Sequence, residues 1–525
     1  MSFILNKFKI IKNNNIIFWS ILLLSAVLLF FHMTYRTFWM DEQAVFLYLY
    51  NSPLQFMIDY FRYPDNHPPL YYFFILLFYS FLPLKEFAIR FLSVISGLGI
   101  VVTVYHYSLL LFKNKKIARL SMLLTAISSY FILMSQMARY HSLVAFFSLL
   151  FFYFFTDIIL HGKNKKNFIL FILFGILVCL TDYPHFIYIV FLSNIYYFYK
   201  FFRKQKILQF GDWVKTQMVL FITFLPMLWL LYQRIFIQGD GGFTKLDLLG
   251  GSILSLSMKF FIHFYVYFFG ENILPWSLNW FPFIFGLIVM VFVLFFIIKY
   301  SLRKKYPQEL YFILYLFLGL VVSNTLFMNY ADPRYNFIVY PKYVFVAFPI
   351  FIILLSYLIF AIKNYVLKYF LILFVVLIQI YGLYNFYSID NYLNASYFNT
   401  FKSFDFVKDN LLEGDYVIIS GDLNQGAYDF YKDRYFIGTK TILLSDMDII
   451  YLNDKKTRFW FFSTSDDGDS AIGARSNRNK IPEGFEILDS YETVSLDPIL
   501  KKYKEKILGR ESYNYKYGVF LLTNK

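Results

Sequence analysis

The sequence has little cysteine, little charge and no nucleotide-binding loop, and each shortage excludes a class of protein. It has one cysteine, Cys179, in 525 residues, which excludes an intramolecular disulfide and a cysteine-cluster metal site. It contains no Gly-x4-Gly-Lys-Ser/Thr loop, which argues against an ATP-driven pump. Only 16% of the residues are charged, whereas 59% are hydrophobic and the mean hydropathy is +0.53. Soluble domains rarely have such a composition.

Long apolar runs dominate the sequence instead. Several contain about 17–25 residues, the length that spans a bilayer, and they predict a polytopic membrane protein. The net charge of +15 would suggest nucleic-acid binding in a soluble protein. Here the basic clusters lie in short loops between apolar runs, so we relate the charge to membrane topology and expect no nucleic-acid partner.

The positive-inside rule turns these clusters into a topology. We place in the cytoplasm the clusters at residues 113–116, 163–166, 203–206, 303–305 and 363–368. An even number of crossings must separate successive clusters, which pairs residues 117–134 with 140–160, 168–183 with 185–202, 214–232 with 276–300, and 309–328 with 337–360. An uncleaved first helix from Ile16 leaves the N-terminus inside, and a last helix over 369–387 carries the tail outside. Together these runs predict about 11–13 transmembrane helices.

Residues 70–84 leave two topologies open. The run is short for a span, and prolines occur just before it at Pro68 and Pro69 and near its end at Pro83. A re-entrant or interfacial segment keeps residues 113–116 inside and Arg90 on the outer side. The alternative is two full crossings, which would put residues 113–116 outside. In the long outer loop 233–275, an aromatic run over Lys259–Gly270 similarly predicts an interfacial helix.

The composition changes after about residue 392, and this change predicts two domains. Residues 1–392 are expected to form the polytopic domain, with a first outer loop at 35–69. Residues 393–525 are mixed and more charged, and predict an extracytoplasmic α/β domain. Its predicted helices are Phe401–Leu412 and Asn424–Lys432, and its predicted strands are Tyr416–Ser420, Arg458–Ser463 and Tyr517–Thr523. The expected fold class is therefore mainly α, a polytopic membrane helix bundle with a C-terminal α/β domain.

The first outer loop holds the strongest functional signal. Asp41 and Glu42 follow the first apolar run, and His67-Pro68-Pro69-Leu70 opens the next one. Adjacent carboxylates at a membrane edge are expensive to desolvate. They are either functional or solvated residues that favour the start of a helix through its dipole.

Four motifs in a fixed order resemble those of the GT-C class of membrane glycosyltransferases. They are Asp41-Glu42, the His67 segment HPPLYY, Ala88–Ser93 and Ser135–Leu143. More narrowly, they resemble the family of protein O-mannosyltransferases and lipid A aminoarabinose transferases, well over residues 15–225 and loosely over 226–390. The resemblance implies a GT-C-like bundle in the bacterial cytoplasmic membrane. It also implies transfer of a sugar, with inversion, from a polyprenyl-phosphate donor to an acceptor hydroxyl on the outer side.

The same resemblance implies roles for the acidic pair. Asp41 matches the catalytic aspartate, which would take the proton of the acceptor hydroxyl. Glu42 would orient it or bind a metal, and repulsion between the two carboxylates can raise one pKa. A divalent cation, Mg or Mn, could be held by Asp41, Glu42 and His67, but no ligand spacing of known specificity supports this.

Cations are needed where the lipid phosphate leaves. The expected phosphate-binding residues are His67, Arg90, Arg139 and Arg334, since arginine offers forked donors. Each arginine has an alternative role as a snorkelling residue at the membrane interface. Asp182 and His185 form an expected acceptor-side cluster. The mannosyl branch often has an aspartate soon after the arginine of the fourth motif, where this chain has His141 and Ser142, so that branch's acceptor contacts do not transfer directly.

The sequence leaves alternatives open for both the acceptor and the reaction class. The acceptor is a lipid such as lipopolysaccharide, another glycan or a protein, as expected in cell-envelope glycosylation. A polymer ligase or oligosaccharyltransferase would share the membrane architecture. A transporter or flippase for a lipid-linked sugar predicts inverted repeats, and the sequence shows no internal repeat. An inactive scaffold would not need the acidic pair.

Overall fold

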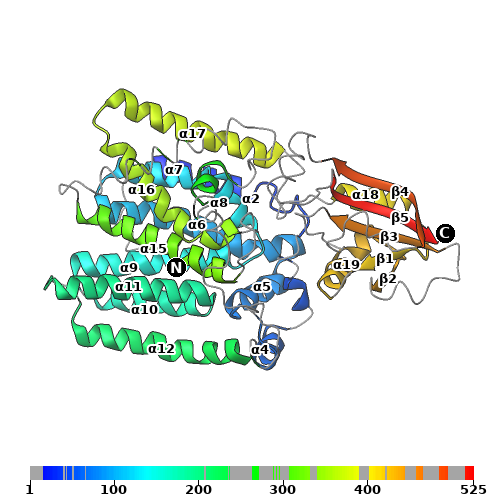
Figure 1. The fold of residues 1–525 in the computed structure, drawn as a ribbon, viewed down its shortest axis with the longest axis horizontal. Helices are drawn as coiled ribbons and strands as arrows, with labels where there is room; N and C mark the ends of the chain where they lie inside the picture. The colour runs from blue at the N-terminus through cyan, green and yellow to red at the C-terminus, as the bar shows by residue number, and fades with distance from the viewer. Residues whose placement is uncertain are drawn as a thin grey trace.

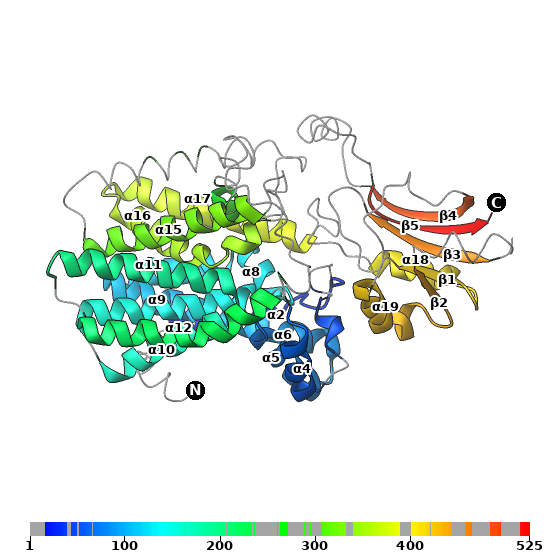
Figure 2. The same cartoon turned by 60° about the horizontal axis from the view of Figure 1, so that its bottom comes forward.

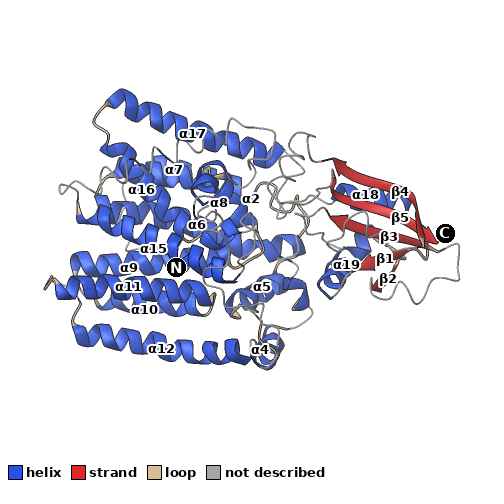
Figure 3. Ribbon diagram, in the orientation of Figure 1, coloured by secondary structure: helices blue, strands red, loops and turns tan. Residues whose placement is uncertain are grey.

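The structure is a computed structural model in which a helical body joins a smaller sheet (Figures 1 and 3). It describes residues 16–38, 42, 44–49, 52–65, 67–162, 164–205, 208–233, 236, 260, 263–270, 288, 291, 295, 307–331, 340–388, 401–419, 422–443, 457–464, 484–494 and 515–524. Asp41, Arg334, and most of the predicted span 276–300 and of the loop 233–275 lie outside these residues.

The helical body is built from apolar helices that lie roughly alongside one another (Figure 1). Their bounds are α2 (Ile16–Phe30), α4 (Pro53–Arg62), α5 (Leu70–Phe81), α6 (Lys85–Phe112), α7 (Lys115–Ala126), α8 (Ser129–Gln136), α9 (His141–His161), α10 (Lys165–Cys179), α11 (Tyr183–Phe202), α12 (Phe210–Tyr232), α15 (Gln308–Ala331), α16 (Ala347–Ala361) and α17 (Tyr365–Ser388). Short polar loops set their starts. Asn114, Asn164 and Asp182 each accept a backbone N–H of the following first turn.

The described helices are consistent with a multi-pass membrane protein. Five are long and apolar enough to cross a membrane, and α7 with α8 makes a sixth if this pair is one span. The predicted crossing 117–134 corresponds to two helices, because α7 and α8 are bent by 60° at a break. The break falls at Ile127 and Ser128, where the Ser128 hydroxyl accepts the N–H of Phe131 and starts a new helix.

The short helix α5 bears on the two topologies left open for residues 70–84. It has 12 residues, which makes it about 18 Å long at the rise of an α-helix, against a hydrocarbon core of about 30 Å. This length agrees with a re-entrant or interfacial segment. The N–H of Leu70 donates to the carbonyl of Leu180 at 3.2 Å, which sets the start of α5 beside the turn between α10 and α11.

The expected interfacial helix of the long loop differs from what the structure describes. Residues 263–269 are helical, and their aromatic side chains are buried. Phe264 packs edge-on against Phe317 of α15, and Tyr267 packs against Phe351 of α16. Aromatic rings of α15 and α16 cover this segment, and its own aromatic, apolar sequence did not reveal that position.

The C-terminal part forms a five-stranded sheet with the strand order β2-β1-β3-β5-β4. Its strands are β1 (Tyr416–Ile419), β2 (Lys440–Leu443), β3 (Arg458–Thr464), β4 (Phe485–Val494) and β5 (Tyr515–Asn524). Strand β1 pairs in parallel with β2 and β3, whereas β5 is antiparallel to β3 and β4. Helices α18 (Phe401–Asn410) and α19 (Asp422–Tyr435) pack with this sheet.

The sheet lies beyond one end of the helical body, with α19 nearest to that body (Figures 1 and 2). We call this end of the body the sheet-side end; it carries Glu42, His67, Arg139 and Asp182. Helix α19 contacts the short 3-10 helix η2 (Ala44–Leu47) in the first outer loop. The segment that carries the acidic pair therefore lies between the helical body and the C-terminal sheet.

Candidate functional site

Glu42 is anchored by a buried ion pair with Arg90 of α6. Its side chain is buried, and Arg90 donates from Nε to Oε1 at 3.3 Å and from Nη2 to Oε2 at 3.2 Å. The backbone N–H of Ala138, between α8 and α9, donates to Oε1 at 2.6 Å. Such a two-pronged contact fixes the carboxylate in position and in rotation. Glu42 and Arg90, both expected at the site, are therefore brought together, and we call this contact the Glu42–Arg90 clamp.

The remaining donors of Arg90 hold the chain that follows α2. Nη1 donates to the carbonyls of Met33 at 2.7 Å and Arg36 at 2.8 Å, and Nη2 donates to that of Thr37 at 3.3 Å. The ring of Phe38 lies 4.3 Å from the guanidinium carbon. Protein acceptors thus occupy the guanidinium, so the geometry supports a positioning role for Arg90 in place of the expected phosphate contact.

The clamp bears on Asp41, although Asp41 lies outside the described residues. Glu42 is bonded directly to it, so the clamp fixes the chain immediately after the expected base. A buried ion pair that loses one partner typically costs about 3–5 kcal/mol, because a charge is left buried without compensation. The position of Glu42 is therefore tied to α6 and to the connection between α8 and α9.

A second cluster centres on the buried carboxylate of Asp182. It accepts from Nδ1 of His185 at 2.5 Å, and Nδ1 of His67 lies 3.5 Å from its other oxygen. Burial by itself raises the pKa of Asp182, but His185 and His67 outweigh it and hold the pKa of this carboxyl well below its usual range. Asp182 is therefore an ionised anchor for two imidazoles.

His185 joins this cluster to the short helix η4 (Tyr340–Val344). Its Nε2 lies 3.0 Å from the carbonyl oxygen of Tyr343, while Nδ1 faces Asp182. The two ring nitrogens of His185 thus link Asp182 to the η4 turn. Lys342, in the same turn, is also buried, and its ammonium lies 5.0 Å from the ring of Tyr343.

The residues between α8 and α9 connect the two clusters. Arg139 donates from Nη1 to the hydroxyl of Tyr72 at 3.1 Å. The ring of Tyr140 lies 4.3 Å from that of His67 and 4.5 Å from that of His141. Since Ala138 donates to Glu42 and Tyr140 packs against His67, a stretch of four residues reaches both clusters.

The structure thus places the expected residues in a pattern that the sequence did not fully predict. Glu42 meets Arg90, and His67 meets Asp182 and His185, which we had assigned to a separate acceptor side. Asp41 and Arg334 lie outside the described residues. We did not anticipate Lys342, the position of His141 or the N–H of Ala138. The sequence did contain a signal for Lys342, because an ionisable residue in an apolar, tyrosine-rich run of a membrane protein indicates a functional site.

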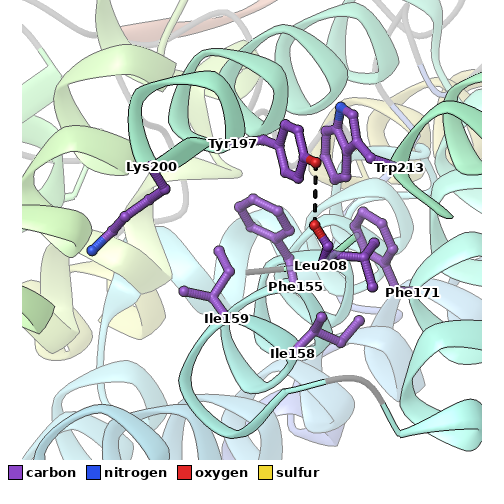
Figure 4. A pocket seen from close by; sticks show the side chains of 8 residues that line it. All are labelled: Phe155, Ile158, Ile159, Phe171, Tyr197, Lys200, Leu208 and Trp213. Carbon is purple, nitrogen blue, oxygen red and sulfur yellow. Dashed lines mark hydrogen bonds between the residues drawn. The ribbon is translucent and has the colours of Figure 1, made fainter. Parts of the chain in front are cut away.

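A small hollow lies far from these clusters, near the last turn of α11 (Figure 4). It is lined by Phe155, Ile158, Ile159, Phe171, Tyr197, Lys200, Leu208 and Trp213. Tyr197 stacks on Trp213 at 4.2 Å, and Lys200 points away from these rings to donate to Gln308 at 3.0 Å. Lys200 lies about 25 Å along the axis of α11 from Tyr183. We interpret the hollow as an aromatic packing gap that does not belong to the site.

No group of three or more His, Cys, Asp or Glu side chains among the described residues has the arrangement to hold a metal ion. Both oxygens of Glu42 are already engaged by Arg90, and Oε1 also by Ala138. The described geometry therefore favours the orienting role of Glu42 over its expected role as a metal ligand.

Comparisons with known proteins agree with this arrangement. Residues 66–230 match the family model of dolichyl-phosphate-mannose-protein mannosyltransferase. No curated protein matches the sequence. The crystal structure of ArnT from Cupriavidus metallidurans bound to undecaprenyl phosphate is similar, with a TM-score of 0.51 and 10% identity over 96% of this chain and 97% of that chain.

The apo structure of the same ArnT gives a TM-score of 0.51 and 10% identity over 85% of this chain and 92% of that chain. At this identity the likeness establishes the fold, which includes both the helical body and the C-terminal part. The matched family segment contains His67, Arg90, Arg139, Asp182 and His185. The family match thus lies in residues 66–230, and over nearly its whole length the chain has a fold similar to that of ArnT.

Proposed function

We propose that the chain transfers a sugar from a polyprenyl-phosphate donor to an acceptor hydroxyl at the sheet-side end of the helical body. The observation that carries the proposal is the buried Asp182 with His185 and His67 against it, beside the stretch that carries Arg139 and that donates to Glu42 of the clamp. Arg139 and the two imidazoles are groups that can donate to a phosphate whose negative charge grows as the sugar leaves. The ArnT of the same fold binds undecaprenyl phosphate, a donor carrier of this chemical class.

The proposed reaction is a single displacement at the anomeric carbon. The acceptor oxygen forms a bond to that carbon as the bond to the phosphate oxygen breaks, and the electron pair stays on the lipid phosphate. Asp41 takes the proton of the acceptor hydroxyl as the general base. Attack from the side opposite the phosphate inverts the anomeric centre. The Glu42–Arg90 clamp supports this role because it fixes the chain next to Asp41.

The lipid phosphate is proposed to bind beside Arg139 and His67. Arg139 is buried but polar in its surroundings, since it donates to the hydroxyl of Tyr72. His67 keeps 21% of its side chain exposed, so a ligand has access to its ring. Arg334 is proposed as a further phosphate contact from its Arg-Tyr motif. Asp182 and His185 then act as a positioning pair for His67, and the acceptor contacts remain unassigned.

The proposal places the sheet-side end on the outer face of a bacterial cytoplasmic membrane. Basic clusters such as residues 113–116 and 363–368 support this orientation through the positive-inside rule. In that orientation the donor lipid reaches the site from the membrane, and the acceptor arrives from the envelope side. A lipid, a glycan and a protein are all acceptors of suitable chemistry. Since Glu42 is engaged by Arg90, we propose that protein cations, without an obligatory Mg or Mn ion, neutralise the phosphate.

A donor-consumption assay on purified protein tests the function. Polyprenyl-phosphate donors carrying different sugars are supplied with an acceptor extract, and released polyprenyl phosphate is measured. We expect Arg139→Ala to lower kcat/KM by about 10²–10³-fold, as for loss of a charge-stabilising donor. Lys200→Ala, a buried cation at the other end of the body, is the matched control and should retain turnover. Equal turnover of both variants and the wild type would contradict the assigned phosphate site.

A further inference from the structure

We infer that helix α19 of the C-terminal domain is a positioning element of the transfer site, because it holds the first outer loop against the Glu42–Arg90 clamp. The inference rests on the proposed function and adds to it a role for the C-terminal domain. The residues that carry it are Gly426 and Phe430 of α19, and Phe38 and Phe46 of the loop.

Phe430 packs its ring against both phenylalanines of the loop. Its centroid lies 5.0 Å from that of Phe46 and 5.7 Å from that of Phe38, the latter in an edge-to-face arrangement. The rings of Phe38 and Phe46 are themselves 5.3 Å apart and edge-on. Phe38 and Phe46 are both almost fully buried. Aromatic contacts of this kind contribute about 0.5–1.5 kcal/mol each beyond the area they bury.

The contact leads directly to the clamp. Phe38 packs against the guanidinium of Arg90 at 4.3 Å, and Arg90 holds Glu42 at 3.2 Å. The first outer loop thus packs against a helix of the membrane body on one side and against a helix of the C-terminal domain on the other. A change in the packing of Phe430 therefore displaces Phe38 and, through it, the cation that orients Glu42.

Gly426 shows how closely α19 approaches the loop. A Cβ atom built on Gly426 would lie 2.8 Å from Cβ of Phe46, a distance at which something must move. Glycine inside a helix costs about 1 kcal/mol relative to alanine. A glycine within α19 is explained because the backbone of the helix comes into close contact with the loop at this point.

Tyr431 and Arg434 extend the contact but are poorer probes. Tyr431 is buried near Arg90, but it also packs edge-on against Phe404 of α18 at 5.4 Å, so its removal would damage the domain's own core. Arg434 lies 4.0 Å from Glu86 of α6 and is largely exposed, so this pair contributes little. Phe430 and Gly426 are the residues whose main described role is the contact with the loop.

The test compares Phe430→Ala and Gly426→Val with Ile437→Ala in the full-length chain. Ile437 lies just beyond α19 and is 66% exposed, so it is a matched control in the same domain. With the donor assay, we expect kcat of the first two variants to fall by about 10–100-fold, as for misplacement of a reacting group. The KM for the polyprenyl-phosphate donor should change by less than about threefold, because neither substitution touches the proposed phosphate contacts.

Hydrogen exchange supplies a readout that does not depend on turnover. Amides of residues 33–49 should exchange faster in Phe430→Ala than in Ile437→Ala, while amides of β3 stay protected and show that the domain remains folded. Unchanged exchange of the loop, or unchanged kcat with an active wild type, would overturn the inference. If the wild type consumes no donor while Phe430→Ala still loosens the loop, the proposed function fails and the positioning contact stands.

Discussion

Arg90 is the residue on which the geometry of the first outer loop most depends. It is 48 positions from Glu42 in the sequence, yet its guanidinium holds both oxygens of Glu42 and the carbonyls of Met33, Arg36 and Thr37. The motif around Arg90 predicted that the residue matters, but a motif does not reveal a partner. Phosphate contact and loop positioning need the same side chain, and only the tertiary structure distinguishes them.

We expect Arg90→Ala to reduce the free energy of unfolding by about 3–5 kcal/mol, because Glu42 would be left buried and unpaired. Thermal unfolding in detergent measures this loss. The double variant Arg90→Met with Glu42→Gln should recover a large part of it, since no buried charge then remains. A loss in Arg90→Ala below about 1 kcal/mol, the range of exposed ion pairs, would show that the clamp does not form.

The lowered pKa of Asp182 predicts a pH-dependent stability. Since the folded pKa lies below the ordinary value of about 3.9, the ionised carboxylate stabilises the fold fully above that pH. This stabilisation is lost as the pH falls through the lower folded pKa. Asp182→Asn should therefore unfold at a lower temperature than wild type at pH 7, and the difference should shrink below about pH 4. A difference that grows on acidification would contradict the described cluster.

Helix α8 helps to hold the end of another element, helix α2. At its last residue, Gln136 donates from Nε2 to the carbonyls of Leu29 at 3.0 Å and Phe31 at 2.8 Å. These are carbonyls at the C-terminal end of α2, which lack partners within the helix. The break between α7 and α8 turns the chain so that Gln136 reaches them and the connection to α9 reaches Glu42.

Gln136→Leu keeps a similar shape and removes the donors. We expect a loss of about 1–3 kcal/mol in the free energy of unfolding, the cost of leaving buried carbonyls without a hydrogen bond. The loop that follows α2 should also exchange its amides faster. Gln217→Leu on α12 is a comparison in which the lost contact, with Asn194, is remote from the site. Equal effects of the two variants would indicate that Gln136 has no special role at α2.

The strands that the sequence did not predict lie where its pattern of apolar residues is weakest. Strands β1, β3 and β5 were predicted from apolar runs, and they occupy the interior of the sheet. The unpredicted strands β2 and β4 are its two edges. Strand β4 carries Glu486, Asp489 and Glu492, the kind of charge that edge strands bear. Interior strands are apolar on both faces and can be predicted from the sequence, whereas the composition of edge strands resembles that of loops.

At the scale of the whole molecule, composition and motif order predicted the fold class, a helix bundle with a C-terminal α/β domain, and the structure confirmed it. The relation between the parts was not predictable. Phe46 and Phe430 are nearly four hundred positions apart, and no local pattern predicts that their rings meet. Likewise Asp182 precedes α11 and His67 precedes α5, and the two meet because α5 starts beside the turn between α10 and α11. Sequence identified most of the site's residues, and packing decided their partners.

The measurement that tests the central claim most directly is polyprenyl-phosphate release by purified wild type and by Asp41→Asn. This substitution keeps the side chain's shape and removes the base, so the account predicts release by wild type and a fall of about 10²–10⁴-fold in the variant. Turnover by Asp41→Asn at the wild-type rate would contradict the account, because the first outer loop would then serve only as a structural edge of the bundle.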